Sequence, residues 1–513
     1  MQKRTERGII ALTAIFFLLF TILACNYYRI AFSQEYVSAA QERSEVTISA
    51  GEIEGTIYDR NMKPIVNAET VTKAVIVPSA VERQEAEKFA VDKADFREAY
   101  AKGEPFVFEC TENTPESDGL TVFEIPERYA ETQLASHIVG YISDGSGMDG
   151  LEYAYDSVLR GDTAENSVTY NVDGFGHILI GDGKEVVRTQ AYGGVVTTID
   201  SELQRICEEC GKDIEKGAIV LADIKTGDIL AMASFPTYSP DEIENALTDE
   251  SLPLINRALY SYSVGSVFKL VTAAQAIDEG FADFMYDCTG NINIKGQYFN
   301  CHKLSGHGLQ SMSDAITNSC NTYFISLSSS LNVESFRKLA YSLGFGRENY
   351  LCAGITGSAG VLPTTKQLMI PAELANFSFG QGKLTATPLQ ITQLTCAIGG
   401  EGKMPVLRLI RGVTVDGETV GNEKQPQISK VLEPETAEQL KKLMIFAIRN
   451  NKDSNARTNK ISVGAKTSTA QTGRVDDDGV ELCNGWITGF FPARKPKYAL
   501  TVLVEDGGYG NDC

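Results

Sequence analysis

The chain has 513 residues, 43% of them hydrophobic, which is enough to bury a large core and to build two or three domains. Its 46 basic and 67 acidic side chains leave a formal net charge of −21. Such an acidic chain lacks the basic face that a nucleic-acid-binding protein needs, so we expect no nucleic-acid partner.

The N-terminus has the composition of a membrane anchor. Lys3, Arg4 and Arg7 precede an uncharged stretch from Gly8 to Ala24. Basic residues ahead of an apolar stretch keep that end in the cytoplasm. We therefore expect a cytoplasmic stub (1–7), a single transmembrane helix (8–25) and a bulk that is extracytoplasmic at the cell membrane. The segment ending in Cys25 also resembles a lipoprotein cleavage site, and lipidation would equally tether the chain.

Two further regions follow the anchor. Residues 26–185 begin with a polar stalk and then mix short strands with helical stretches. From 186 to 513, helical patterns alternate with strands, and we expect an antiparallel sheet with helices on both faces. Near the start of this region, "GAIVLADIKTGDILAMAS" predicts a hairpin whose turn is Lys225-Thr226-Gly227, with Gly227 at positive φ.

Eleven cysteines raise the question of disulfides in an exported chain. Cys288 and Cys301 flank a short turn-rich loop and could pair. Cys207 and Cys210 form a Cys-x-x-Cys within a predicted helix, which favours a pair of surface thiols. With no second Cys-x-x-Cys and no His-Glu-x-x-His, we expect no metal site.

Ser266 and Lys269 are the first candidates for chemistry. They lie three residues apart in "SYSVGSVFKLVTAA", where a helix begins, so the amine can reach the hydroxyl. A buried lysine of lowered pKa can act as the base that activates a serine. The same spacing occurs at Ser335 and Lys338, which we interpret as an exposed helix face.

Two later motifs extend this set in chain order. Ser319 and Asn321 lie in "ITNSCNTYF", where a hydroxyl and an amide two residues apart can relay a proton and hold a carbonyl. Lys466, Thr467, Ser468 and Thr469 lie in the strand-like "ISVGAKTSTAQ". The order Ser-x-x-Lys, Ser-x-Asn, Lys-Thr-x is the set of the serine enzymes that act on penicillins.

The surrounding sequence carries a resemblance to a known family. The segments "YGGVVTTIDSELQ", "LINRALYSYSVGSVFKLVTAAQAID", "SFGQGKLTATPLQIT" and "GWITGFFPARKPKYALTVLVEDGG" resemble the transpeptidase domain of class B penicillin-binding proteins. Upstream, "GTIYDRNMKPI" and "HIVGYISDGSGMDGLEYAYDSVLRGD" resemble the pedestal of that family. The resemblance implies a multidomain α+β protein: a membrane anchor, an elongated α+β pedestal of the dimerisation type (26–185) and the penicillin-binding serine-transpeptidase fold (186–513).

The resemblance also implies roles for the motifs. Ser266 would form the acyl-enzyme with a peptidoglycan stem peptide ending in D-Ala-D-Ala, and Lys269 would be its base. Ser319 would pass the proton to the leaving D-alanine, and Asn321 would bind the peptide carbonyl or orient Lys269. Lys466 would set the local electrostatic potential, and Thr467 and Thr469 would contact the terminal carboxylate of the stem peptide. The N–H groups of Ser266 and Thr469 would form the oxyanion hole.

The implied activity is that of a peptidoglycan D,D-transpeptidase that is inhibited by β-lactams and uses no cofactor or metal. A membrane glycosyltransferase of the shape, elongation, division and sporulation family is the implied partner. The alternatives are a D,D-carboxypeptidase or β-lactamase, and a β-lactam sensor or low-turnover scaffold of division or sporulation. A pure scaffold would not need all four of Ser266, Lys269, Ser319 and Lys466.

One residue departs from the family pattern. Ser468 stands where glycine is usual, and a Cβ there is expected to narrow the gap to the substrate backbone. We therefore expect Ser468 to be a substrate-binding residue. The enzyme should stay active with serine at this position but be acylated more slowly by β-lactams, so Ser468→Gly would change the acylation rate.

Overall fold

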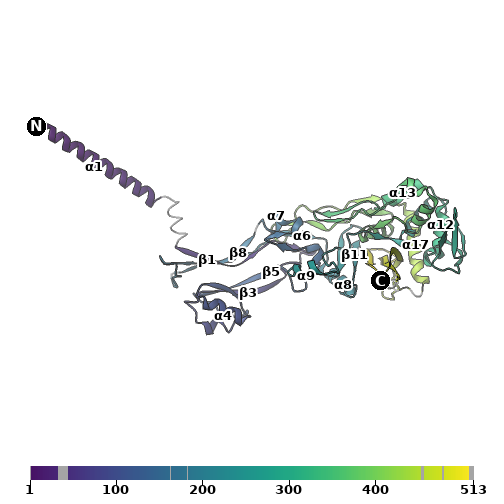
Figure 1. The fold of residues 1–513 in the computed structure, drawn as a ribbon, viewed down its shortest axis with the longest axis horizontal. Helices are drawn as coiled ribbons and strands as arrows, with labels where there is room; N and C mark the ends of the chain where they lie inside the picture. The colour runs from purple at the N-terminus through teal and green to yellow at the C-terminus, as the bar shows by residue number, and fades with distance from the viewer. Residues whose placement is uncertain are drawn as a thin grey trace. The chain divides into compact units, whose positions relative to one another are not determined.

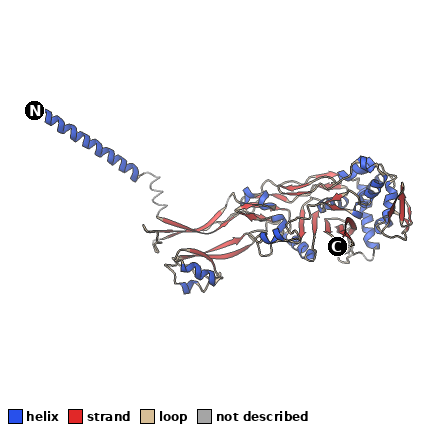
Figure 2. Ribbon diagram, in the orientation of Figure 1, coloured by secondary structure: helices blue, strands red, loops and turns tan. Residues whose placement is uncertain are grey.

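The structure is a computed structural model in which residues 2–32, 44–161, 163–181, 183–451, 454, 456–475 and 479–507 are described. Figures 1 and 2 show its helices and strands. Part of the expected stalk (33–43) and the last residues, with Cys513, lie outside the described residues. The chain forms two compact units, each made of separate segments: 1–54, 70–127 and 163–191 in unit 1, and 55–69, 128–162 and 192–513 in unit 2. The contiguous limits 26–185 and 186–513 remain a prediction.

The chain begins with a long apolar helix, α1 (Gln2–Ala31). Among the described residues it alone is long and apolar enough to cross a membrane, with a mean hydropathy of 2.6 and none of that stretch buried. The helix extends beyond the expected limits of 8–25 at both ends, since its polar flanks at Lys3 and Arg29 continue the same helical turns.

Unit 1 contains two small three-stranded sheets, of strand orders β1-β8-β9 and β4-β3-β5. Its strands and main helix are β1 (Glu45–Ile53), β3 (Glu69–Ile76), α4 (Lys93–Ala101), β4 (Phe106–Glu109), β5 (Leu120–Glu127), β8 (Ala164–Asn171) and β9 (Lys184–Val187). Helix α4 begins at Asp92, whose carboxylate accepts from the N–H groups of Ala94 and Asp95. A helix N-terminus leaves such N–H groups unpaired, so this cap stabilises the first turn.

Unit 2 is organised by a five-stranded antiparallel sheet of order β12-β11-β26-β25-β24. The strands are β11 (Gly217–Asp223), β12 (Ile229–Phe235), β24 (Gly464–Val475), β25 (Glu481–Phe491) and β26 (Tyr498–Val504). In this order β24 is an edge strand, although it comes before β25 and β26 in the chain.

The two faces of this sheet pack into different hydrophobic clusters. Side chains alternate across a strand, and in β11 Ala218 and Val220 join the large central cluster, whereas Ile219 and Leu221 join a second cluster with Cys207. The central side is covered by α16 (Pro388–Gly399) and α17 (Pro434–Asn450), and the second side by α8 (Ser201–Gly211). The predicted antiparallel sheet with helices on both faces is confirmed.

The upstream Lys-Thr-Gly is the predicted hairpin turn between β11 and β12. Gly227 has φ +76°, a conformation that glycine adopts without strain. The Asp223 carboxylate accepts from the N–H groups of Lys225 and Thr226, each at 2.9 Å. The upstream Lys-Thr-Gly is therefore a structural turn.

The other elements of unit 2 surround the central sheet or connect its strands. The helices are α5 (Ser136–Val139), α6 (Gly150–Ala154), α7 (Asp156–Leu159), α9 (Ile243–Thr248), the 3₁₀ helix η1 (Gly265–Phe268), α10 (Lys269–Asp278), α11 (Met312–Thr317), α12 (Asn321–Ser328), α13 (Val333–Ser342), α14 (Thr365–Leu368) and α15 (Pro371–Ser378). The paired strands are β2 (Thr56–Tyr58), β10 (Gly194–Thr197) and β22 (Ile410–Thr414); β6 (Ile142–Ser143) and β7 (Ser146–Gly147); β13 (Tyr262–Ser263) and β20 (Thr385–Ala386); β14 (Tyr286–Cys288) and β17 (Gly308–Gln310); β15 (Asn291–Ile294) and β16 (Gln297–Asn300); β18 (Asn349–Cys352) and β19 (Ile355–Gly357); β21 (Lys403–Pro405) and β23 (Ile428–Lys430).

Candidate active site

Ser266 and Lys269 meet at the junction between η1 and α10. In a 3₁₀ turn, residues i and i+3 lie directly above one another, and Nζ of Lys269 lies 2.9 Å from Oγ of Ser266. The lysine side chain is fully buried. The sequence prediction that this amine reaches the hydroxyl agrees with the structure.

Ser319 and Asn321 approach the same amine from the connection between α11 and α12. Nζ of Lys269 lies 2.6 Å from the carbonyl oxygen of Ser319, 3.2 Å from its Oγ and 2.7 Å from Oδ1 of Asn321. Ser319 has φ +51°, a left-handed conformation that is unfavourable for a residue with a side chain. This backbone turn presents both the carbonyl and the hydroxyl of Ser319 to one lysine.

Lys466 completes the cluster from β24. Its Nζ lies 3.2 Å from Oγ of Ser319 and 2.7 Å from the carbonyl oxygen of Thr467. The three motifs are separated by about 50 and 150 residues in the chain, yet Ser319 touches both lysines. The structure therefore brings Ser266, Lys269, Ser319, Asn321 and Lys466 into one site.

Burial controls the charge of both lysines. Desolvation, together with the nearby charge of Lys466, lowers the pKa of Lys269 well below its usual value. Desolvation lowers the pKa of Lys466 to about 8. The amine of Lys269 can therefore be neutral while Lys466 still carries its proton, which is the arrangement a base beside a cation requires.

The three residues after Lys466 face different environments. Thr467 and Thr469 are half-buried, whereas Ser468 is only 3% exposed. The hydroxyl of Ser468 donates to the carbonyl oxygen of Val264, at 2.9 Å. The hydroxyl of Ser468 is thus paired with the protein backbone, and a contact between this side chain and substrate stays a prediction.

A second cluster lies against the Ser319–Asn321 connection. The sulfur atoms of Cys288, Cys301 and Cys320 and a ring nitrogen of His307 all lie within 4.8 Å of one another. Nδ1 of His307 is 3.6 Å from Sγ of Cys288 and 3.5 Å from Sγ of Cys301. Burial lowers the pKa of His307, which favours the neutral, ligating form of the ring. Three thiols and one imidazole are the donor set of a tetrahedral structural zinc site, so these residues could hold one such ion.

Several cysteine expectations change accordingly. Cys288 and Cys301 are both free thiols, so the pairing considered from the sequence is not formed. Cys207 and Cys210 do lie on one helix, but Cys207 is buried and only Cys210 is exposed, so they are not a pair of surface thiols. The four-residue cluster does not show in the sequence, because its members are spread over three separate segments. The available signal was Cys320, the middle residue of the Ser-x-Asn motif.

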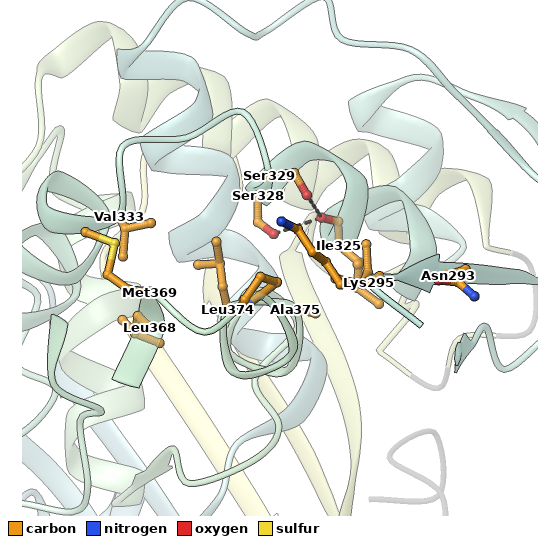
Figure 3. A pocket seen from close by; sticks show the side chains of 12 residues that line it. Asn293, Lys295, Ile325, Ser328, Ser329, Val333, Leu368, Met369, Leu374 and Ala375 are labelled. Atoms are coloured by element: carbon orange, nitrogen blue, oxygen red, sulfur yellow. Dashed lines mark hydrogen bonds between the residues drawn. The ribbon is translucent and has the colours of Figure 1, made fainter. Parts of the chain in front are cut away.

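A cavity of about 340 Å³ lies beside the other end of α12 (Figure 3). Its lining includes Lys295 from the β15–β16 turn, Ile325 from α12 and Leu374 from α15. None of the candidate catalytic residues lines this cavity. The cavity is therefore separate from the candidate catalytic residues around Ser266.

Comparison with known proteins gives the family. The model of the penicillin binding protein transpeptidase domain matches residues 217–512. Stage V sporulation protein D of Bacillus subtilis is 27% identical over 94% of this chain and 78% of its own length. The peptidoglycan D,D-transpeptidase MrdA of Acinetobacter baumannii is 26% identical over 99% of this chain and 86% of its own length.

Solved structures share the fold. Penicillin-binding protein A of Mycobacterium tuberculosis, solved as a ceftriaxone acyl-enzyme complex, has a TM-score of 0.62 at 22% identity, covering 74% of this chain and 87% of its own. A chain from a structure described as "Structural coordination of polymerization and crosslinking by a peptidoglycan synthase complex" has a TM-score of 0.69 at 23% identity. The match covers 98% of this chain and 96% of that one.

The family match spans more than half of the chain, and it includes β11, the catalytic cluster and β24. The chain therefore belongs to the penicillin-binding protein transpeptidase family. Within it, the chain is a class B penicillin-binding protein, a peptidoglycan D,D-transpeptidase.

Proposed function

We propose that the transpeptidase works through a serine acyl-enzyme in which Ser266 is the nucleophile and Lys269 its base. One observation carries this proposal: the buried Nζ of Lys269 lies 2.9 Å from Oγ of Ser266. A serine hydroxyl is a weak nucleophile at its own pKa and needs such a neighbour. Since burial lowers the pKa of Lys269, a neutral amine is available to take the proton.

The acylation step follows from this geometry. Oγ of Ser266 attacks the carbonyl carbon between the two terminal D-alanines, and its proton passes to the neutral amine of Lys269. When the C–N bond breaks, Ser319, which contacts both lysines, relays that proton to the leaving amine of D-alanine. The amine of a second stem peptide then attacks the ester, forms the cross-link and returns a proton to Ser266.

Asn321, Lys466 and the two threonines have supporting roles in this proposal. Asn321 accepts from Lys269 at 2.7 Å and so holds the base toward the nucleophile. Protonated Lys466 supplies positive potential for the terminal carboxylate, which Thr467 and Thr469 meet from β24. The N–H groups of Ser266 and Thr469 form the oxyanion hole, the arrangement that stabilises charge developing on a carbonyl oxygen.

Labelling with a fluorescent penicillin tests the nucleophile. We expect wild type to form a covalent adduct and Ser266→Ala to form none while keeping its melting temperature. The matched control is Ser335→Ala, since Ser335 and Lys338 have the same spacing but are exposed on α13. Labelling of folded Ser266→Ala, or no labelling of folded wild type, would exclude the proposed mechanism.

The membrane arrangement and partner are part of the same proposal. The basic residues in the first turns of α1 (Lys3, Arg4 and Arg7) favour a cytoplasmic location for that end and an extracytoplasmic location for the chain after the helix. A membrane glycosyltransferase of the shape, elongation, division and sporulation family would supply the glycan strands. The likeness to a chain of a peptidoglycan synthase complex supports such a partner. Protease protection in spheroplasts tests the first point, and co-purification of the full chain from membranes tests the second.

A further inference from the structure

The segment that leads into Ser266 is fixed by side chains of the central sheet. Ser468 of β24 donates from Oγ to the carbonyl oxygen of Val264, at 2.9 Å. Val264 lies two residues before Ser266 and is itself fully buried. A hydroxyl on β24 is thus bonded directly to the turn that carries the nucleophile.

A neighbouring donor reinforces this attachment. Trp486 of β25 lies directly opposite Ser468 in the strand pairing. Its indole Nε1 donates to the carbonyl oxygen of Ser263, at 2.9 Å. Two cross-strand partners therefore bind two consecutive carbonyls, those of Ser263 and Val264.

The fit between Ser468 and the next residue of the turn is close. Gly265 has φ +61°, and a Cβ added there would lie 2.4 Å from Oγ of Ser468. Its N–H donates to the carbonyl oxygen of Gly380, at 2.7 Å. The turn can thus lie close to β24 because Gly265 has no side chain. The hydroxyl of Ser468 occupies the space between them and makes a hydrogen bond there.

We infer that Ser468 is a positioning residue that sets the distance between the nucleophile turn and β24. The inference rests on the proposed function, because that function takes one oxyanion-hole N–H from Ser266 on the turn and the other from Thr469 on β24. Ser468 adjoins Thr469 in the chain and bonds to the residue two before Ser266. It therefore links the two halves of the oxyanion hole without touching the substrate.

The physical reason is the sensitivity of acyl transfer to geometry. A displacement of about 1 Å in a reacting group can lower a rate by roughly 100-fold, and oxyanion donors act only at hydrogen-bonding distance from the developing charge. Removing the Ser468 hydroxyl leaves the carbonyl of Val264 without this buried donor. We expect the turn to shift and the acylation rate constant to fall about tenfold, while the affinity for the unreacted β-lactam stays the same.

The test compares full-length wild type with Ser468→Ala and Ser468→Gly. Stopped-flow measurements with a chromogenic cephalosporin separate the dissociation constant from the acylation rate constant. Infrared difference spectra of the acyl-enzyme report the ester carbonyl, whose stretching frequency rises when the oxyanion hole polarises it less. We expect both variants to show slower acylation and a higher frequency, with an unchanged dissociation constant.

Ser234→Ala is the matched control. Ser234 is equally buried, lies on β12 at the opposite edge of the same sheet, and donates to the carbonyl oxygen of Ile255 at 2.9 Å. We expect its substitution to lower the melting temperature without changing the acylation rate or the ester frequency. The inference would be overturned if Ser468→Ala had the acylation rate and ester frequency of wild type. It would also be overturned if Ser234→Ala showed the slower acylation and higher frequency expected of Ser468→Ala. Loss of labelling in wild type, or labelling of Ser266→Ala, would instead contradict the proposed function.

Discussion

Lys269 and Lys466 approach a single hydroxyl, that of Ser319, and each Nζ lies 3.2 Å from its Oγ. Two buried ammonium groups this close would repel each other, so the site favours a state in which one of them is neutral. Because the charge of Lys466 further lowers the pKa of Lys269, Lys269 is the one that loses its proton first.

The acylation rate should therefore have a bell-shaped dependence on pH. The rate rises with pH as Lys269 loses its proton, and it falls through about pH 8 as Lys466 loses the proton that attracts the carboxylate. Stopped-flow acylation of wild type at a series of pH values on both sides of about pH 8 measures the profile. In Lys466→Arg the guanidinium stays protonated, so the alkaline limb should disappear; an unchanged limb would contradict the assignment.

The cluster of Cys288, Cys301, His307 and Cys320 should bind one zinc ion per chain. Elemental analysis of protein purified without chelator should find about one equivalent, and Cys301→Ser should lose most of it, because hydroxyl oxygen is a poor ligand for a thiolate-rich site. A chelator should lower the melting temperature of wild type but not that of Cys301→Ser. Cys352→Ser, a buried thiol outside the cluster, should keep its zinc. Zinc-free wild type with an unchanged melting temperature would rule out the ion.

Gly265→Ala should destabilise the catalytic unit by about 2–4 kcal/mol, since alanine is strained at positive φ and its Cβ meets Oγ of Ser468. Thermal and chemical denaturation measure the loss. In the double variant Gly265→Ala/Ser468→Gly the contact with Oγ of Ser468 is removed, although the added Cβ still lies 3.0 Å from Cβ of Ala470. The loss of stability in the double variant should therefore be smaller than the sum of the losses in the two single variants. If the stability losses of the two single variants simply add in the double variant, the two side chains do not compete for the same space.

Cys25→Ala should remain in the membrane fraction. Cys25 lies within the continuous helix α1, and an apolar helix of this length holds a protein in a bilayer without a lipid. Alkaline extraction of membranes, followed by immunoblotting, separates anchored from peripheral protein. Release of the variant by alkaline extraction would instead favour the lipidated form.

The sequence predicted the members of the candidate site, which the structure brings together, because each motif is local. Ser266 and Lys269 lie one helical turn apart. Lys466 lies within a short stretch whose pattern predicts a strand, and this too is visible from neighbouring residues alone. The order of the motifs then identified the family that brings them together.

What the sequence could not provide were the relationships between distant segments. Nothing local relates Cys288 to Cys320, or tells which side of β24 faces the nucleophile turn. Because side chains alternate along a strand, Lys466 and Ser468 lie on the same side of β24. Only the packed structure shows that Val264 and Gly265 occupy the space next to the Ser468 side chain. The narrowed substrate gap stays a prediction, and the inward hydrogen bond of Ser468 leads us to expect that Ser468→Gly slows acylation.

The inward direction of Ser468 also bears on how this transpeptidase would distinguish antibiotics. Its hydroxyl meets the protein backbone, so the side chains by which penicillins, cephalosporins and carbapenems differ have no contact with it. Substitutions at this position should therefore change susceptibility to all β-lactam classes by a similar factor. Discrimination between drugs must come from residues on the exposed side of the site, with Thr467 and Thr469 the nearest candidates on β24.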